Sequence, residues 1–247
     1  LGSVFVFTTL LIAIPSAVKA FNYITTLWKG NIQYTPAMLF SIGLVSSFIT
    51  GGVTGIILAD STLDINVHDT YFVVAHFHIV MGLSAIFGMF AGVYHWFPKL
   101  FLRMMNKKLG YLHFWLTFIP VVYIYNLMMA QGYMGMPRRL YNPYEYNILK
   151  ALLPLNRYIA YTVGAMAIGQ LIFFGNLFWT YFFGSKAADN PWEVGTLEWS
   201  TPTPIPHHNF DKIPTVYHGP HEFSHPNQKD GRDWNYQTEI VEGVSRT

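Results

Sequence analysis

The sequence contains no cysteine, and only 11% of its residues are charged. The first absence excludes disulfide bonds, thiolate-bound iron–sulfur clusters, a covalently attached CxxCH heme and a thiolate-bridged copper centre. The second sets the chain apart from soluble domains, in which about 25% of residues are charged. The net charge of +2 is too small to favour a nucleic-acid partner. With 52% hydrophobic residues and a positive mean hydropathy, the composition predicts a membrane protein.

Long apolar runs fill most of the chain. A helix needs about 20 apolar residues to cross the hydrocarbon core of a bilayer. Runs of that length occupy residues 4–28, 37–59, 71–97, 111–134 and 155–184. We therefore expect an all-α integral membrane protein with five transmembrane helices. No signal-peptide pattern precedes them. Because the first residues already lie in an apolar run and are not preceded by Met, we expect this chain to be part of a larger protein.

Basic residues gather in alternate loops, which predicts the orientation. They follow the first, third and fifth spans, at Lys29, at Lys99, Arg103, Lys107 and Lys108, and at Lys186. The positive-inside rule places that side in the cytoplasm. The loop after the second span carries acidic residues and no Lys or Arg, and we expect it to face outward.

Residues 185–247 differ in kind from residues 1–184. They are polar and rich in proline, and they hold no apolar stretch that would form a core. We expect a transmembrane region over 1–184 and an irregular cytoplasmic tail over 185–247 that lies on neighbouring protein. The histidines of this tail lack any fixed ligand spacing, so exposed, solvated side chains are expected at His207, His208, His218, His221 and His225.

Two histidines in the third span carry the most specific signal. His76 and His78 are separated by one residue, and successive side chains on a helix are rotated by about 100°. The two imidazoles therefore point in nearly opposite directions and cannot bind the same metal ion. An intramembrane histidine is a functional residue by default, and neutral imidazole is an axial ligand of heme iron. Two hemes that flank one helix satisfy this geometry; interhelical hydrogen bonds are the alternative.

Further polar residues lie at the expected outer end of the same span. Asp64, His68 and Asp69 precede it, and the adjacent Arg138 and Arg139 follow the fourth span. Arginine binds carboxylates in bidentate fashion, so the pair is suited to heme propionates, although an ordinary basic loop is possible. His68 and Asp69 suit a Mg or Mn ion if a partner adds ligands; a solvated acidic loop is the alternative.

A lysine interrupts the first span. Lys19 lies three residues after Ser16, so the amine and the hydroxyl share one helix face. A titratable amine beside a hydroxyl inside the membrane is typical of a proton route. The alternative is that Lys19 extends to the inner interface. Pro15 is expected to kink this helix.

Several of these motifs, in chain order, strongly resemble subunit I of the heme–copper cytochrome c oxidases. They are Ile14–Lys19, Gly51–Gly55, His68–Tyr71 with His76–His78, His95–Pro98 and Gly135–Arg139. Residues 190–199 resemble the carboxyl end of bacterial members. The resemblance implies that this chain is the C-terminal part of subunit I, with the last five of twelve core helices.

The resemblance also implies a role for each residue that matches a motif. His76 would be the axial ligand of the high-spin heme, and His78 an axial ligand of the low-spin heme. Arg138, Arg139 and Asp64 would belong to the propionate network. His68 and Asp69 would contribute to the Mg or Mn site, and Lys19 with Ser16 to a proton pathway.

The resemblance further implies two hemes of the A type and a copper ion whose ligands lie outside this chain. The partners implied are the remainder of subunit I, a copper-bearing subunit II, subunit III, a cytochrome c or c-type cytochrome donor and the lipid bilayer. The bacterial character of the motifs implies a bacterial inner membrane.

Three other functions remain open at this stage. A quinol oxidase of the same superfamily differs in a copper site that belongs to another subunit. A non-enzymatic polytopic transporter would be favoured by inverted internal repeats, and the sequence shows none. A diheme quinone–cytochrome module usually binds its hemes between two ligand-bearing helices, and only the third span carries such a pair.

Overall fold

The computed structural model describes residues 2–219, 222 and 234–240. The chain forms two compact units, which comprise residues 1–94 with 107–176 and residues 95–106 with 177–247. Helices dominate the described part, and the one sheet found there has two strands of two residues each. The prediction of an all-α protein is therefore confirmed.

The first two helices are one apolar segment broken near its middle. Helix α1 (Gly2–Leu11) and helix α2 (Ala13–Leu27) are separated at Ile12. Pro15 has no backbone N–H, so it cannot bond the carbonyl four residues earlier, and the helical ladder is interrupted there. The helix is thus interrupted one turn before Pro15, and the expected kink stays a prediction. Helix α2 buries none of its residues within the chain, so its apolar surface requires lipid or another protein to cover it.

Helix α3 (Pro36–Ala59) begins at two local signals. Thr35 caps it by accepting a hydrogen bond from the Met38 N–H at 3.3 Å, and proline occupies its first turn, where no N–H is needed. The short helix α4 (Ser61–Val67) follows at once, and Asp60 caps it through the Thr62 N–H at 2.8 Å. This hydrogen-bonding, led by the Thr62 hydroxyl, holds the pKa of Asp60 below its usual value.

The third span changes its helical type where the paired histidines lie. Helix α5 (Tyr71–Phe77) is capped by Thr70, the π-helical segment η1 (His78–Leu83) follows, and α6 (Ser84–Phe101) continues the rod. A π-helical turn is rare and frequently occurs at functional sites. The apolar run predicted a regular helix here, and the π-helical segment departs from it.

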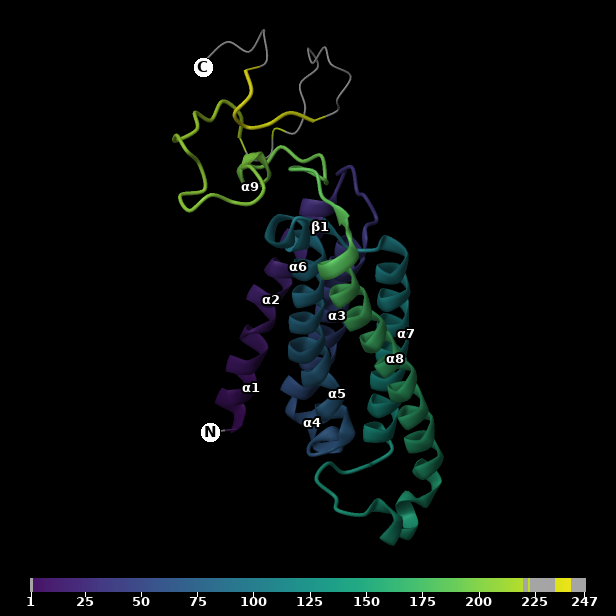
Figure 1. Cartoon of the computed structure of the whole chain (residues 1–247). Coiled ribbons are helices and arrows are strands. Elements are labelled where there is room, and N and C mark those ends of the chain that lie inside the picture. The colour runs from purple at the N-terminus through teal and green to yellow at the C-terminus, as the bar shows by residue number, and fades with distance from the viewer. Residues whose placement is uncertain (1, 220–221, 223–233, 241–247) are drawn as a thin grey trace. The chain divides into compact units, whose positions relative to one another are not determined.

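Close approach of helices locks α5 and η1 between their neighbours. Figure 1 shows α3, α5 and α7 (Lys107–Tyr133) as adjacent rods, and both α5–α7 and α3–η1 are in contact. A Cβ at Gly132 of α7 would collide with the backbone of Phe72, and one at Gly51 of α3 would lie 2.5 Å from Val80 Cγ2. Glycine at these positions lets the backbones touch.

The remaining elements of the first unit lead into the last long helix. They are the 3₁₀ turns η2 (Pro143–Glu145) and η3 (Asn147–Leu152) and helix α8 (Leu153–Phe183), which continues into the second unit. Met136, Leu149 and Leu152 form a small buried cluster here, against which Tyr71 and Leu140 pack.

The second unit contains the ends of α6 and α8 together with the polar tail. Strand β1 (Arg103–Met104) pairs antiparallel with β2 (Ser185–Lys186), and helix α9 (Leu197–Ser200) is a single turn. The rest of its described residues are turns and extended chain, as expected. His218 contradicts the expectation of solvated histidines: it is buried, and its Nε2 donates to the Glu239 carbonyl at 2.8 Å. His221 and His225 lie outside the described residues.

Five helical segments of the described part are long and apolar enough to cross a membrane. They are Val4–Leu27, Pro36–Ala59, Tyr71–Phe101, Lys107–Tyr133 and Asn147–Phe183. The number of predicted spans is therefore confirmed. The bounds differ most at the start of the fifth segment, which begins at Asn147 rather than at residue 155 because the 3₁₀ turn η3 leads directly into α8.

Candidate functional site

His76 is fixed against helix α3 through one ring nitrogen. Its Nδ1 lies 3.0 Å from the Gly51 carbonyl oxygen and 2.9 Å from Thr54 Oγ1. A carbonyl only accepts, so Nδ1 carries the proton and Nε2 keeps its lone pair. The ring edge also faces Gly55, where a Cβ would lie 3.0 Å from His76 Cε1. The site thus presents a positioned neutral imidazole with Nε2 available as a donor.

His78 is prepared in the same way but faces a different helix. Its Nδ1 lies 2.8 Å from the Val74 carbonyl oxygen, which again leaves the lone pair on Nε2. The ring stacks on Tyr125 of α7, with centroids 5.9 Å apart and planes inclined by 24°. The expectation that the two rings face different sides of the helix is confirmed, with α3 beside His76 and α7 beside His78.

The two outer motifs pair with each other along the backbone. The Tyr71 N–H donates to the Met136 carbonyl at 3.0 Å, and the Arg138 N–H donates to the Asp69 carbonyl at 2.8 Å. Thr70 and Pro137 form an antiparallel bridge between these bonds. Asp69 and Arg139 both adopt positive φ, at 56° and 66°, which turns the chain sharply at either end of the pairing.

Charged side chains reinforce this pairing. Arg138 donates to Asp69 Oδ1 from Nε at 2.7 Å and from a terminal nitrogen at 2.5 Å. This hydrogen-bonding is the main reason that the pKa of Asp69 is lowered from its ordinary value of 3.8. His68 lies between two carboxylates, 3.4 Å from Asp64 Oδ2 and 3.5 Å from Asp69 Oδ2. The structure therefore joins all the predicted outer residues except Arg139 by direct polar contacts.

These acidic residues do not complete a metal site by themselves. Within the described residues, no group of three or more His, Cys, Asp or Glu side chains is arranged to hold a metal ion. Because Asp69 Oδ1 is engaged by Arg138, only its other oxygen faces His68. The role of His68 and Asp69 in a Mg or Mn site stays a prediction that requires ligands from a partner.

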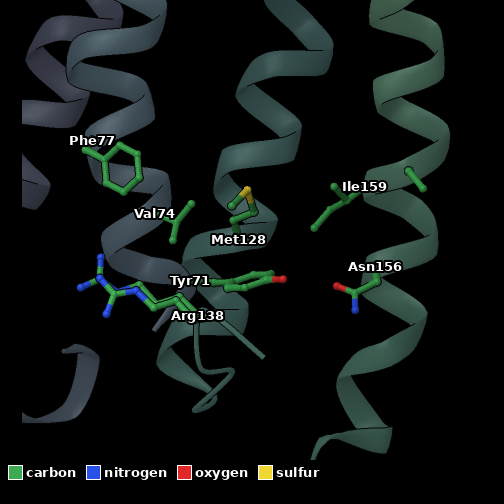
Figure 2. A pocket seen from close by; sticks show the side chains of 9 residues that line it. Tyr71, Val74, Phe77, Met128, Arg138, Asn156 and Ile159 are labelled. Atoms are coloured by element: carbon green, nitrogen blue, oxygen red, sulfur yellow. The ribbon is translucent and has the colours of Figure 1, made fainter. Parts of the chain in front are cut away.

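A cavity of about 670 Å³ lies on the α7 side of α5, a volume typical of ligand pockets. Its walls come from α5, α7, α8 and the arginine loop, namely Tyr71, Val74, Phe77, Met128, Arg138, Arg139, Asn156, Ile159 and Ala160. Figure 2 shows Tyr71 spanning it, with the hydroxyl directed toward Asn156 on α8. Val74 lies four residues before His78 and so shares its helix face.

The residues present fit a heme on each side of this helix. On the helix face that His78 shares with Val74, the cavity is mostly apolar and has Arg138 and Arg139 in its wall, which suits a flat apolar ring with carboxylate groups. On the His76 side, the chemistry of the donor fits, since Nδ1 is bonded to a carbonyl and the lone pair of Nε2 is left for an iron ion. The ligand roles themselves stay predictions.

The proposed proton residues share a helix but do not contact each other. The Ser16 hydroxyl donates to the Ile12 carbonyl at 2.9 Å, and Lys19 Nζ lies 5.6 Å from the centre of the Tyr23 ring. Both lie on α2, three residues apart, as predicted. Their part in a proton pathway remains a prediction.

A further histidine of the membrane spans, His113, is buried and was not singled out from the sequence. His113 of α7 is fully buried, and its Nδ1 lies 3.1 Å from the Tyr94 hydroxyl. The rings of Phe40, Phe90 and Phe173 surround it at centroid distances of 4.6 to 4.9 Å. A lone histidine in an apolar run was the available signal, but without a surrounding motif it did not distinguish a structural role from a functional one.

Comparison with known proteins identifies what this arrangement is similar to. A family model described as Cytochrome C and Quinol oxidase polypeptide I matches residues 1–167. The chain is 46% identical over 221 residues to the cytochrome c oxidase subunit 1 of Synechocystis sp., which covers 89% of this chain and 39% of that protein. It is 42% identical over 234 residues to an alternative cytochrome c oxidase subunit 1 of Bradyrhizobium diazoefficiens. That match covers 91% of this chain and 39% of the relative.

The chain thus spans about two fifths of the length of these relatives. A solved structure, a cryo-EM structure of a heme–copper terminal oxidase dimer, matches with a TM-score of 0.64. That match has 22% sequence identity and covers 76% of this chain and 37% of the other. At this identity the likeness establishes the fold.

Proposed function

Because this chain belongs to the heme–copper oxidase subunit I family, we propose that it forms part of the catalytic subunit of a terminal respiratory oxidase. The complex would oxidise cytochrome c, reduce dioxygen to water and pump protons across the membrane. The observation that carries the proposal is the pair of imidazoles at His76 and His78, which present Nε2 on two sides of one helix.

His76 would bind the high-spin heme and His78 the low-spin heme. When bound, the two hemes and the copper ion, whose ligands would lie outside this chain, supply the electron transfer and the oxygen chemistry. The protein holds each imidazole in the ligating tautomer by a backbone carbonyl, Gly51 for His76 and Val74 for His78. A carbonyl on the opposite nitrogen also increases the basicity of the ligand.

The outer charges would hold the propionates. Arg138 and Arg139 bring two cations to the wall of the cavity, and Asp69 fixes the position of Arg138. Asp64 would belong to the same network through His68. With ligands from subunit II, His68 and Asp69 would also contribute to a Mg or Mn site.

Lys19 and Ser16 would belong to a proton pathway that leads through the first span. The exposed face of α2 would then be covered by other parts of subunit I. We further propose the orientation and division inferred from the sequence: residues 1–184 in a bacterial inner membrane, and residues 185–247 on its cytoplasmic face. The remaining partners would be subunit III and a c-type cytochrome. A quinol donor is the second candidate, since the matching family description names both kinds of oxidase.

The test is the optical spectrum of the purified complex, oxidised and reduced, for two variants. His78→Ala should remove the low-spin heme signal, and His76→Ala should remove the high-spin heme signal, each leaving the other heme detectable. His68→Ala is the matched control, because His68 lies in the outer loop, and it should retain both signals. Unchanged spectra in both ligand variants would refute the proposal.

A further inference from the structure

A cluster of indoles surrounds His95 in the second unit, apart from the proposed heme ligands. The Trp199 Nε1–H donates to His95 Nε2 at 3.3 Å, and the Trp192 ring stacks on the imidazole with centroids 5.7 Å apart and planes inclined by 16°. Trp192 Nε1 donates to the His95 carbonyl at 3.0 Å. Residues of α6 and of the tail segment 189–201 thus meet at one imidazole.

The same ring nitrogen has a second candidate partner. Glu198 Oε1 lies 3.8 Å from His95 Nε2, and the other oxygen of this carboxylate accepts from the Trp96 indole at 3.4 Å. Trp96 therefore holds the carboxylate beside the imidazole. A nitrogen that accepts from Trp199 must be unprotonated, whereas a nitrogen that bonds a carboxylate must donate. His95 Nε2 can satisfy only one of these partners at a time.

A buried lysine anchors the segment independently of His95. Lys99 is only 4% exposed; its Nζ donates to the Thr201 and Asp189 carbonyls at 2.5 and 3.3 Å and lies 5.3 Å from the centre of the Trp199 ring. The charged groups around the imidazole are thus Glu198 on α9, Lys99 on α6, and Asp189 beyond Lys99. The hydrogen bonds of Lys99 go to backbone carbonyls and do not involve His95. Lys99 therefore holds the segment whether the imidazole is neutral or protonated.

We propose that His95 is a pH-operated clasp between the end of α6 and helix α9. Neutral His95 accepts from Trp199 and holds α9 in place. Protonated His95 donates to Glu198 instead, so the Trp199 indole loses its acceptor and α9 loosens, while Lys99 keeps the segment attached. Trp192 stays stacked, since an aromatic face attracts a cation. The His95 side chain is 33% exposed, which allows protons from water to reach it. This inference does not depend on the proposed oxidase function.

A spin label on α9 tests the clasp. The chain has no cysteine, so Ser200→Cys provides a unique site in it, and the unsubstituted chain in the complete complex gives the background. From about pH 8 to about pH 5, the range in which histidine titrates, the label should change reversibly from mostly immobilised to mostly mobile. A label whose mobility does not depend on pH would overturn the proposal.

Variants at the cluster assign the response to its groups. His95→Gln keeps an oxygen that accepts from Trp199 but cannot titrate, so the label should stay immobilised throughout. Trp199→Phe removes the donor and should leave the label mobile at both ends of the range, which keeps the test decisive if His95→Gln packs poorly. Glu198→Gln should move the transition to lower pH. His207→Gln is the matched control. In this variant the mobility of the label should change with pH as it does in the labelled chain without further substitutions. A full response in His95→Gln or in Trp199→Phe would contradict the mechanism.

Discussion

The contact between Gly55 and His76 offers the sharpest test of the proposed high-spin heme site. A Cβ at Gly55 would lie 3.0 Å from His76 Cε1, which is 0.4 Å short of the 3.4 Å at which ordinary van der Waals contact begins. The Gly55→Ala methyl group must therefore displace the imidazole. The ring cannot yield freely, because its Nδ1 is bonded to Gly51 and Thr54 on the same helix.

The expected change in the midpoint potential of the high-spin heme follows from the hydrogen bond that this displacement weakens. Weakening the hydrogen bond at Nδ1 costs about 1 kcal/mol. Alanine in place of a mid-helix glycine gains about 1 kcal/mol, so the stability of the protein should hardly change. The imidazole becomes a poorer electron donor, which disfavours the oxidised iron. Since 1.4 kcal/mol corresponds to about 59 mV for one electron, the midpoint potential of the high-spin heme should rise by up to about 40 mV.

Gly52→Ala is the matched control for this measurement. A Cβ at Gly52 meets no atom within 4 Å, yet the substitution makes the same chemical change on the same helix. An anaerobic redox titration followed optically measures both hemes, and the low-spin heme serves as an internal reference. The reasoning is refuted if Gly55→Ala leaves the high-spin potential unchanged, or if Gly52→Ala shifts it equally.

Three further predictions concern other parts of the molecule. Arg138→Gln should lower a heme midpoint potential in a redox titration, because a cation beside the propionates favours the electron-rich state; an unchanged potential would indicate an ordinary loop. Arg138→Gln should also let the pKa of Asp69 return toward 3.8, because the hydrogen bond from Arg138 is the main cause of its lowering. As the pH falls, the Asp69 carboxylate would then become protonated earlier than it does beside Arg138. Lys19→Met should slow anaerobic reduction of the high-spin heme if the amine supplies protons, and stopped-flow spectra measure that rate. Gly132→Ala should reduce the amount of assembled protein in the membrane, because its Cβ would collide with the Phe72 backbone; immunoblotting of membranes, with Gly164→Ala as an uncrowded control, decides this.

The fold was predictable wherever hydrophobicity alone determines an element. Each expected span overlaps a helix of the structure, because apolar runs of this length have no other stable form in a bilayer. The π-helical turn at His78 was not predictable, since it depends on how η1 packs against α3 rather than on a local residue preference. The buried His218 was also missed, because its partner Glu239 is 21 residues away in a segment of low hydrophobicity.

In the candidate site, too, local geometry was predictable from the sequence and contacts between distant segments were not. The spacing of His76 and His78 was enough to predict that the rings face different sides of their helix, since rotation per residue is a property of any helix. The pairing of Asp69 with Arg138 was not anticipated, because both were assigned to propionates or metal. It depends on a backbone bridge between segments that lie almost 70 residues apart. Likewise, the motifs at His95 and at residues 190–199 were noted separately, and only the structure joins them.

The π-helical turn also has a consequence for how this span tolerates changes in length. A wide turn holds one more residue than a regular turn but completes the same rotation, so deleting a residue between 79 and 82 would leave an uninterrupted α-helix. The half that follows would then keep its direction relative to the paired imidazoles, and Phe87 and Phe90 would still pack on Phe40. The same deletion in the regular part of α6 would rotate the residues after it by about 100°. This span should therefore tolerate the loss of one residue within the π-helical segment better than a loss beyond it.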